Sequence, residues 1–133
     1  MNESLRPSTD PVKILIVEDE TIVAMEIQDL LENEGWTVVG VASSGEDAIR
    51  RARDERPDVV LMDITLRGKM TGIEAAELIL DARLVPVLFL TAAADQAGIA
   101  RVQGRTACGF VSKPFEERAF LGEVRKLVQP AGR

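Results

Sequence analysis

The sequence has no histidine and only one cysteine, Cys108, and these shortages exclude several kinds of site. Without histidine the chain cannot build a histidine metal site, use a histidine general base or carry a phosphohistidine. A lone cysteine cannot form a disulfide within the chain, and it cannot supply the paired thiolates of a zinc site. Carboxylates, hydroxyls and amines remain as the candidate chemical groups.

Long apolar runs are also missing. No run approaches the ~18 residues of a membrane-spanning helix, and residues 1–11 (MNESLRPSTDP) lack the apolar core of a secretory signal. We therefore expect a cytoplasmic protein with no membrane partner. Basic residues are outnumbered, 16 against 22 acidic ones, which gives a net charge of −6. Attraction to a phosphate backbone cannot dominate binding, so direct nucleic-acid binding is disfavoured.

The length of 133 residues fits one ordinary domain, and 46% of the residues are hydrophobic, as expected of a folded chain. Both ends are polar or rich in proline and glycine. We expect a single domain over residues 12–128, with a flexible N-terminal tail at 1–11 and a C-terminal tail at 129–133.

Within the domain, strand-like and helix-like segments alternate. The run VKILIV at 12–17 is typical of a strand buried on both faces of a parallel sheet. Apolar residues then recur at helical spacing from residue 21 until Gly35 stops the helix. The same alternation continues, with strands expected at 37–42, 59–62, 87–90 and 110–111 and helices at 45–56, 72–83, 95–103 and 116–128.

Five β/α units predict an α/β fold: a doubly wound, flavodoxin-like sheet of five parallel strands in the order 2-1-3-4-5. The helix at 95–103 is the weakest of these elements. Gly98 and Gly104 each lower its helix propensity by about 1 kcal/mol relative to alanine, so we expect it to be short or mobile.

Ligands of such sheets bind beyond the carboxyl ends of the strands, where the strand order switches. Polar residues follow the first, third, fourth and fifth expected strands, which are neighbours in that order. We expect their side chains to converge on one pocket; they are Glu18, Asp19 and Glu20, then Asp63, Thr91 and Lys113.

Carboxylates brought together repel one another unless a cation lies between them. Oxygen ligands favour Mg²⁺ or Mn²⁺, and Mg²⁺ completes its shell with water and phosphate oxygens. Asp63 ends a fully apolar run, where a carboxylate can act as a nucleophile and form an aspartyl phosphate. Lys113 and the Thr91 hydroxyl could contact further phosphoryl oxygens. The sequence thus predicts a Mg²⁺-dependent phosphate-handling site.

The motifs ILIVEDE, VLMDITL, LFLTA and GFVSKPF occur in the order and spacing of two-component receiver domains. Over residues 12–128 the chain resembles that family, in its stand-alone, single-domain form. The resemblance implies that Asp63 accepts a phosphoryl group from a sensor histidine kinase or a histidine phosphotransfer protein. It also implies that the chain catalyses only its own phosphorylation and dephosphorylation, and controls a separate output protein through the surface of its last two helices and the strand between them.

The same resemblance assigns further roles. Glu18 stands where aspartate is commoner and could reach the ion through water, and Phe110 stands where tyrosine is commoner. The peptide bond before Pro114 is expected to be cis, which would aim Lys113 into the pocket. The implied metal site is Glu18, Asp19, Asp63 and the backbone carbonyl of Thr65, and the implied switch residues are Thr91 and Phe110.

Other functions remain open at this point. A phosphatase of the haloacid dehalogenase type would need a second aspartate where Thr65 stands, and a flavin carrier would need a phosphate loop where Glu18 and Asp19 stand. An unphosphorylated docking pseudo-receiver would not require the full set of site residues. The oligomeric state, monomer or phosphorylation-dependent dimer, does not follow from the sequence.

Overall fold

The computed structural model describes residues 11–91 and 96–128, and in these residues strands and helices alternate along the chain. The strands are β1 (Lys13–Val17), β2 (Thr37–Ala42), β3 (Val59–Asp63), β4 (Val87–Thr91) and β5 (Cys108–Ser112). The helices are α1 (Thr21–Asn33), α2 (Gly45–Glu55), α3 (Gly72–Ala82), α4 (Gln96–Gln103) and α5 (Glu117–Val128).

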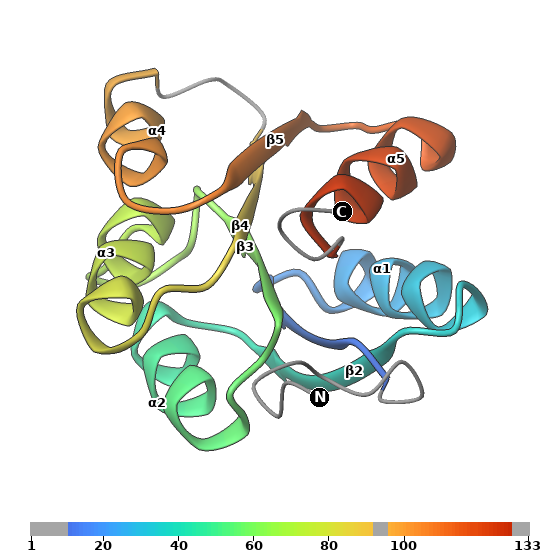
Figure 1. Cartoon of the computed structure of the whole chain (residues 1–133), viewed down its shortest axis with the longest axis horizontal. Coiled ribbons are helices and arrows are strands. Elements are labelled where there is room, and N and C mark those ends of the chain that lie inside the picture. The colour runs from blue at the N-terminus through green and yellow to red at the C-terminus, as the bar shows by residue number, and fades with distance from the viewer. Residues whose placement is uncertain (1–10, 92–95, 129–133) are drawn as a thin grey trace, which may run out of the picture.

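The strands form one parallel sheet in the order β2-β1-β3-β4-β5. Helices α1 and α5 cover one face, and α2, α3 and α4 cover the other (Figure 1). The predicted doubly wound fold and strand order are therefore confirmed.

Each face of the sheet has its own hydrophobic core, because successive side chains of a strand point to opposite faces. In β1, Ile14 and Ile16 pack beneath α1 and α5, whereas Leu15 and Val17 pack on the opposite side. All five residues of β3 and of β4 are buried. Burial on both faces explains why these strands read as continuous apolar runs in the sequence.

Local signals in the sequence fix several helix ends. The side chain of Ser44 accepts a hydrogen bond from the backbone of Asp47 at the start of α2. At the start of α3, Thr71 and Glu74 form a reciprocal capping box. Gly35 has a φ of +91° just beyond α1, a conformation that glycine adopts readily. The predicted stop at Gly35 is confirmed.

Predicted and observed element bounds agree to within two residues. Strand β5 begins at Cys108 rather than Phe110, since it pairs with β4 over its whole length. Helix α4 has 8 residues, which fits the expectation that it is short. Residues 1–10 and 129–133, where tails were expected, and residues 92–95 before α4 lie outside the described part of the chain.

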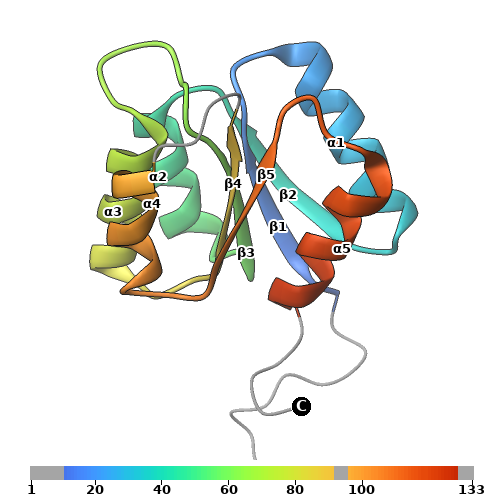
Figure 2. The same ribbon diagram turned by 90° about the horizontal axis from the view of Figure 1, so that it is seen from above.

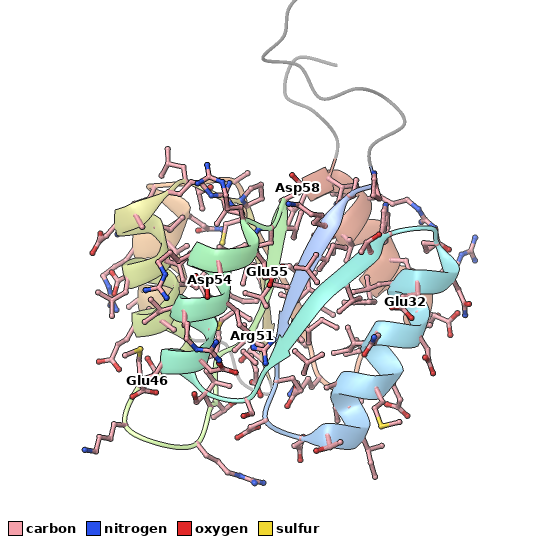
Figure 3. All side chains as sticks on the ribbon, turned by 90° about the horizontal axis from the view of Figure 1, so that it is seen from below. Glu32, Glu46, Arg51, Asp54, Glu55 and Asp58 are labelled. Atoms are coloured by element: carbon pink, nitrogen blue, oxygen red, sulfur yellow. The ribbon has the colours of Figure 1, made fainter. Side chains whose placement is uncertain are left out.

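Strand β2 forms one edge of the sheet, and α2 packs beside it. Figure 3 shows Arg51 on the side of α2 that faces β2. A Cβ atom on Gly40 would lie 2.9 Å from a guanidinium nitrogen of Arg51, so the missing side chain at Gly40 makes room for this arginine. Within the described residues, no helix combines the length and apolarity needed to cross a membrane.

Candidate functional site

The loops that follow β1, β3 and β5 lie at the same end of the sheet (Figure 2). This end carries the buried polar residues of the core: Glu18, Asp63 and Thr91 are 1%, 2% and 2% exposed. Acidic side chains are rarely buried to this degree without partners. The expected pocket at the carboxyl ends of the strands is thus the place where the fold buries charge.

Three carboxylates meet in this pocket. One oxygen from each of Glu18, Asp19 and Asp63 lies within 4.8 Å of the other two. Glu20, the third acid of the same run, is exposed and stands at the N-cap of α1. The structure therefore brings together two of the three acids after β1, and its acidic cluster (Glu18, Asp19 and Asp63) contains the carboxylates predicted for the metal site.

Lys113 reaches into the acidic cluster from the end of β5. Its ammonium group lies 2.8 Å from Glu18 Oε1 and 3.3 Å from Asp63 Oδ2. The side chains of Glu18 and Asp63 are 0% and 3% exposed, so little water screens the two interactions. Lys113 is thereby a built-in counter-ion for two of the three carboxylates.

Burial raises the pKa of Glu18, and the hydrogen bond from Lys113 only partly opposes this rise. Burial alone would lower the pKa of Lys113, but its hydrogen bond to Glu18 and the charges of Asp63 and Glu18 outweigh that effect and raise it. The cluster therefore holds more negative charge than its burial favours, and an additional cation would stabilise it.

The backbone and the loop after β3 orient the Asp63 carboxylate. The amide of Thr65 donates a hydrogen bond to Asp63 Oδ1 at 3.0 Å, and its hydroxyl lies 3.4 Å from the same oxygen. Gly72, the first residue of α3, packs directly against the Asp63 backbone, where a Cβ atom would lie 2.1 Å from the carbonyl oxygen. One carboxylate oxygen of Asp63 thus faces Thr65, and the other faces Lys113.

Thr91 is the last residue of β4, and Lys113 directly follows the neighbouring strand β5. The amide of Lys113 donates a hydrogen bond to the Thr91 carbonyl at 2.7 Å, which ties the two residues together. The Lys113–Pro114 peptide bond is cis, as the family resemblance implied. Phe110 lies on β5 with 43% of its surface exposed, and it lines an open hollow of about 480 Å³ together with Phe115, Ala119 and Lys126 of the α5 region.

Arg67 also contacts the acidic cluster, although no motif in the sequence predicts it there. Its amide donates a hydrogen bond to Asp19 Oδ2 at 3.0 Å, and its guanidinium Nε lies 3.6 Å from the same oxygen. Arg67 is separated from Asp19 by 48 residues and belongs to a loop without a distinctive motif. Only its position shortly after Asp63 could have suggested that it borders the site.

The acidic cluster fits a hard divalent cation. Its donors are carboxylate oxygens at the carboxyl ends of β1 and β3, and Mg²⁺ is typically bound through one or two carboxylates with water and phosphate completing the shell. In the described residues this is the one group of three or more acidic, histidine or cysteine side chains close enough to share an ion. Glu18, Asp19 and Asp63 would hold the ion, while Lys113 stands on the side of Glu18 and Asp63.

Fold and site together define a class of protein. This is a flavodoxin-like α/β domain that gathers acids and a lysine at the strand ends where ligands of such sheets bind, in place of a phosphate-binding loop. The model of the response regulator receiver domain matches residues 14–125. The chain belongs to the response regulator receiver domain family, whose members are generally non-enzymatic signalling domains.

Relatives of known name agree with this membership. The chain is 40% identical over 120 residues to the phyllosphere-induced regulator PhyR of Methylorubrum extorquens, covering 90% of this chain and 39% of that protein. It is 34% identical over 114 residues to the transcriptional regulatory protein PdtaR of Mycobacterium tuberculosis, covering 82% and 55%. The chain thus spans about half the length of PdtaR, or less in the case of PhyR.

Among solved structures, the chain is similar to the N-terminal domain of a three-domain response regulator protein from Carboxydothermus hydrogenoformans. It has a TM-score of 0.77 and 36% identity, and the match covers 87% of this chain and 93% of that one. The signal receiver domain of a modulated diguanylate cyclase from Desulfovibrio desulfuricans has a TM-score of 0.78 and 32% identity, covering 90% and 94%.

Proposed function

We propose that this chain accepts a phosphoryl group on Asp63, with Mg²⁺ held by the acidic cluster, and signals through a change of its surface. The observation that carries the proposal is the placement of Asp63. It is a buried carboxylate with Lys113 on one oxygen and Thr65 on the other, beside two further acids that can hold a cation. A purely structural carboxylate at this position would need partners such as Lys113 and Thr65, but it would not need two further acids beside it.

The donor in this proposal is the phosphohistidine of a sensor kinase or a phosphotransfer protein. A carboxylate oxygen of Asp63 attacks phosphorus, the new P–O bond forms as the P–N bond to the donor histidine breaks, and the imidazole leaves with the bond's electron pair. A bound divalent cation would balance the charge of the phosphoryl oxygens.

The chain's own groups then divide the remaining work. The Asp63 oxygen near Lys113 is the one that an incoming phosphoryl group can share with an ammonium, so Lys113 would exchange a carboxylate contact for a phosphoryl oxygen. The Thr65 amide holds the opposite oxygen and fixes the rotation of the carboxylate. Thr91, buried at the end of β4, would donate its hydroxyl to a third phosphoryl oxygen.

The output surface in this proposal consists of α4, β5 and α5. Thr91 is bonded through its carbonyl to Lys113, and β5 carries Phe110 two residues before its end. Movement of Thr91 towards a phosphoryl group would shift a conformational equilibrium of the Phe110 side chain from the exposed position in this structure towards a more buried position. A partner that binds the hollow beside Phe110 would sense that balance and thus the phosphorylation state.

The test is phosphoryl uptake from acetyl phosphate, measured as the mass increase of the intact protein with Mg²⁺ or with EDTA. Asp63→Asn should abolish uptake. Asp54→Asn is the matched control, because Asp54 lies on α2 with its side chain 50% exposed (Figure 3). Uptake by Asp63→Asn at the wild-type rate would reject the assignment. A folded wild-type protein that never takes up phosphate would instead favour the unphosphorylated docking role.

A further inference from the structure

The Asp19 carboxylate is held by a residue that the proposed reaction does not use. In the part of the chain that the structure describes, both recorded partners of this carboxylate come from Arg67, whose amide and guanidinium meet the same oxygen, Oδ2. The Asp19 side chain is 9% exposed, whereas the Arg67 side chain is 80% exposed. The largely buried carboxylate of Asp19, an acid of the proposed metal site, is thus paired with a solvent-exposed guanidinium.

The loop after β3, residues 64–71, fixes this pairing. Leu66 and Met70 are partly buried against the core on either side of Arg67. The loop tip, residues 67–69, is exposed, and Gly68 turns it with a φ of +100°. Because the shorter contact to Asp19 is made by the Arg67 amide, the loop backbone itself lies against the acid.

The charge of the acidic cluster is therefore partly offset by two cations in different surroundings. Lys113 is 19% exposed and bonded to Glu18 and Asp63, whereas Arg67 is exposed and, among the described residues, its side chain pairs with Asp19 alone. A divalent cation among the three carboxylates repels both. The Lys113 side chain is only 19% exposed, and in the proposed function its ammonium contacts a phosphoryl oxygen. The exposed guanidinium of Arg67 can turn into water at small cost, since surface ion pairs contribute little.

We propose that Arg67 competes with the divalent cation for Asp19, and that cation binding releases the loop tip. This inference rests on the proposed function to the extent that the acidic cluster holds a divalent ion. Thermodynamic linkage makes this competition reciprocal. If the contact between Arg67 and Asp19 lowers the affinity for the divalent cation, a bound cation must weaken that contact by the same factor. The conformation of the loop tip, residues 67–69, would then depend on whether the divalent cation is bound, even before phosphorylation.

Isothermal titration of the full chain with Mg²⁺ tests the competition. Arg67→Gln removes the guanidinium but keeps the backbone amide, and we expect it to bind Mg²⁺ about threefold more tightly at low salt. The gain in Mg²⁺ affinity should shrink in high salt.

Lys69→Gln is the control, because it makes the same charge change on the same loop tip. Among the described residues, no ion pair joins Lys69 to the acidic cluster. Its affinity should stay within about twofold of wild type. Equal affinities of the two variants would overturn the inference.

Amide hydrogen exchange at Arg67 tests the release. The Arg67 amide is bonded to Asp19 Oδ2 in this structure, so its exchange in the wild-type protein should accelerate when Mg²⁺ is added. Slower or unchanged exchange would contradict release of the tip. Failure of the proposed function would give a different result. A wild-type protein that binds no Mg²⁺ and takes up no phosphoryl group would reject the proposed site itself. If the wild-type protein takes up a phosphoryl group but Arg67→Gln and Lys69→Gln bind Mg²⁺ equally well, only the role of Arg67 is rejected.

Discussion

The ammonium of Lys113 lies closer to Glu18, at 2.8 Å, than to Asp63, at 3.3 Å. The lysine is thus held chiefly by an acid of the proposed cation site and only secondarily by the proposed phosphoryl acceptor. The chain has glutamate at position 18, and the length of that side chain lets its carboxylate meet the ammonium while its second oxygen accepts the Glu20 amide at 3.1 Å. Lys113 in this way serves as a resident cation for both buried carboxylates.

Lys113→Met should destabilise the metal-free protein by about 1–3 kcal/mol, because it leaves two buried carboxylates without their cation. Burial already raises the pKa of Glu18, and loss of Lys113 would raise it further. A raised carboxyl pKa means that protonation favours the folded state, so the loss should be largest at pH 8 and shrink as the pH falls through the folded-state pKa towards the ordinary value of 4.5. Urea unfolding at several pH values measures this.

Added Mg²⁺ should stabilise Lys113→Met more than it stabilises the wild-type protein, since the ion supplies the missing positive charge. Lys126→Met is the control, because Lys126 is 72% exposed and its ion pair in the described part of the chain is with Glu123 on its own helix. Its stability should depend on pH and Mg²⁺ as the wild type does. A Lys113→Met protein as stable as wild type at pH 8 without Mg²⁺ would show that the lysine does not neutralise the cluster.

Much of the fold and of the cluster could be predicted because both follow from one-dimensional patterns. Strands buried on both faces leave apolar runs, and parallel strands end at one edge, so Glu18, Asp63, Thr91 and Lys113 had to approach one another once the strand order was known. Right-handed crossovers and helices on both faces of the sheet favour this strand order without fixing every detail of it.

The contacts of irregular segments could not be predicted in this way. Arg67 meets Asp19 because of the path of a loop, which no periodicity encodes. Glu20 was grouped with its two neighbours, yet the turn into α1 carries it into solvent. The preference of Lys113 for Glu18 over Asp63 depends on differences of half an ångström between groups far apart in the chain.

Helix α4 is joined to α3 by two arginine ion pairs at its exposed side. Arg101 lies 3.1 Å from Glu77, and Arg105, just beyond α4, lies 2.7 Å from Asp81. The double variant Arg101→Ala/Arg105→Ala should lower the global free energy of unfolding by less than about 1 kcal/mol, because exposed pairs contribute little. It should nevertheless accelerate amide exchange in α4, since local opening breaks these contacts. Exchange monitored by NMR separates the two effects.

Arg125→Ala provides the comparison for α4, because it removes a pair of similar length, 2.7 Å to Glu34, at the other side of the sheet. Exchange in α4 should be unaffected by this change. High salt should also reduce the difference between the double variant and wild type, as screening weakens exposed pairs. Unchanged α4 exchange in the double variant would mean that buried Ile99 and Val102 alone hold the helix.

Cys108 should react slowly with iodoacetamide in the folded protein. Burial raises the pKa of its thiol to about 11, so little thiolate is present near neutral pH. The rate should rise about tenfold for each pH unit between pH 7.5 and 9.5 and should be about a hundredfold higher in concentrated urea. Alkylation followed by mass spectrometry measures both. A rate that levels off near pH 8 would show that the thiol is not shielded as the structure has it.

Gly72→Ala should disturb the acceptor aspartate through the backbone. A Cβ atom at this position would lie 2.1 Å from the Asp63 carbonyl oxygen and 2.8 Å from Ile64 Cα, and backbone atoms cannot rotate aside. We expect a loss of about 1–3 kcal/mol in urea unfolding, with slower phosphoryl uptake because the Asp63 carboxylate shifts. A Cβ atom on Gly122 of α5 would meet no atom of the described residues within 4 Å, so Gly122→Ala should instead stabilise the protein by up to about 1 kcal/mol. Equal effects of the two substitutions would contradict the close packing of α3 on Asp63.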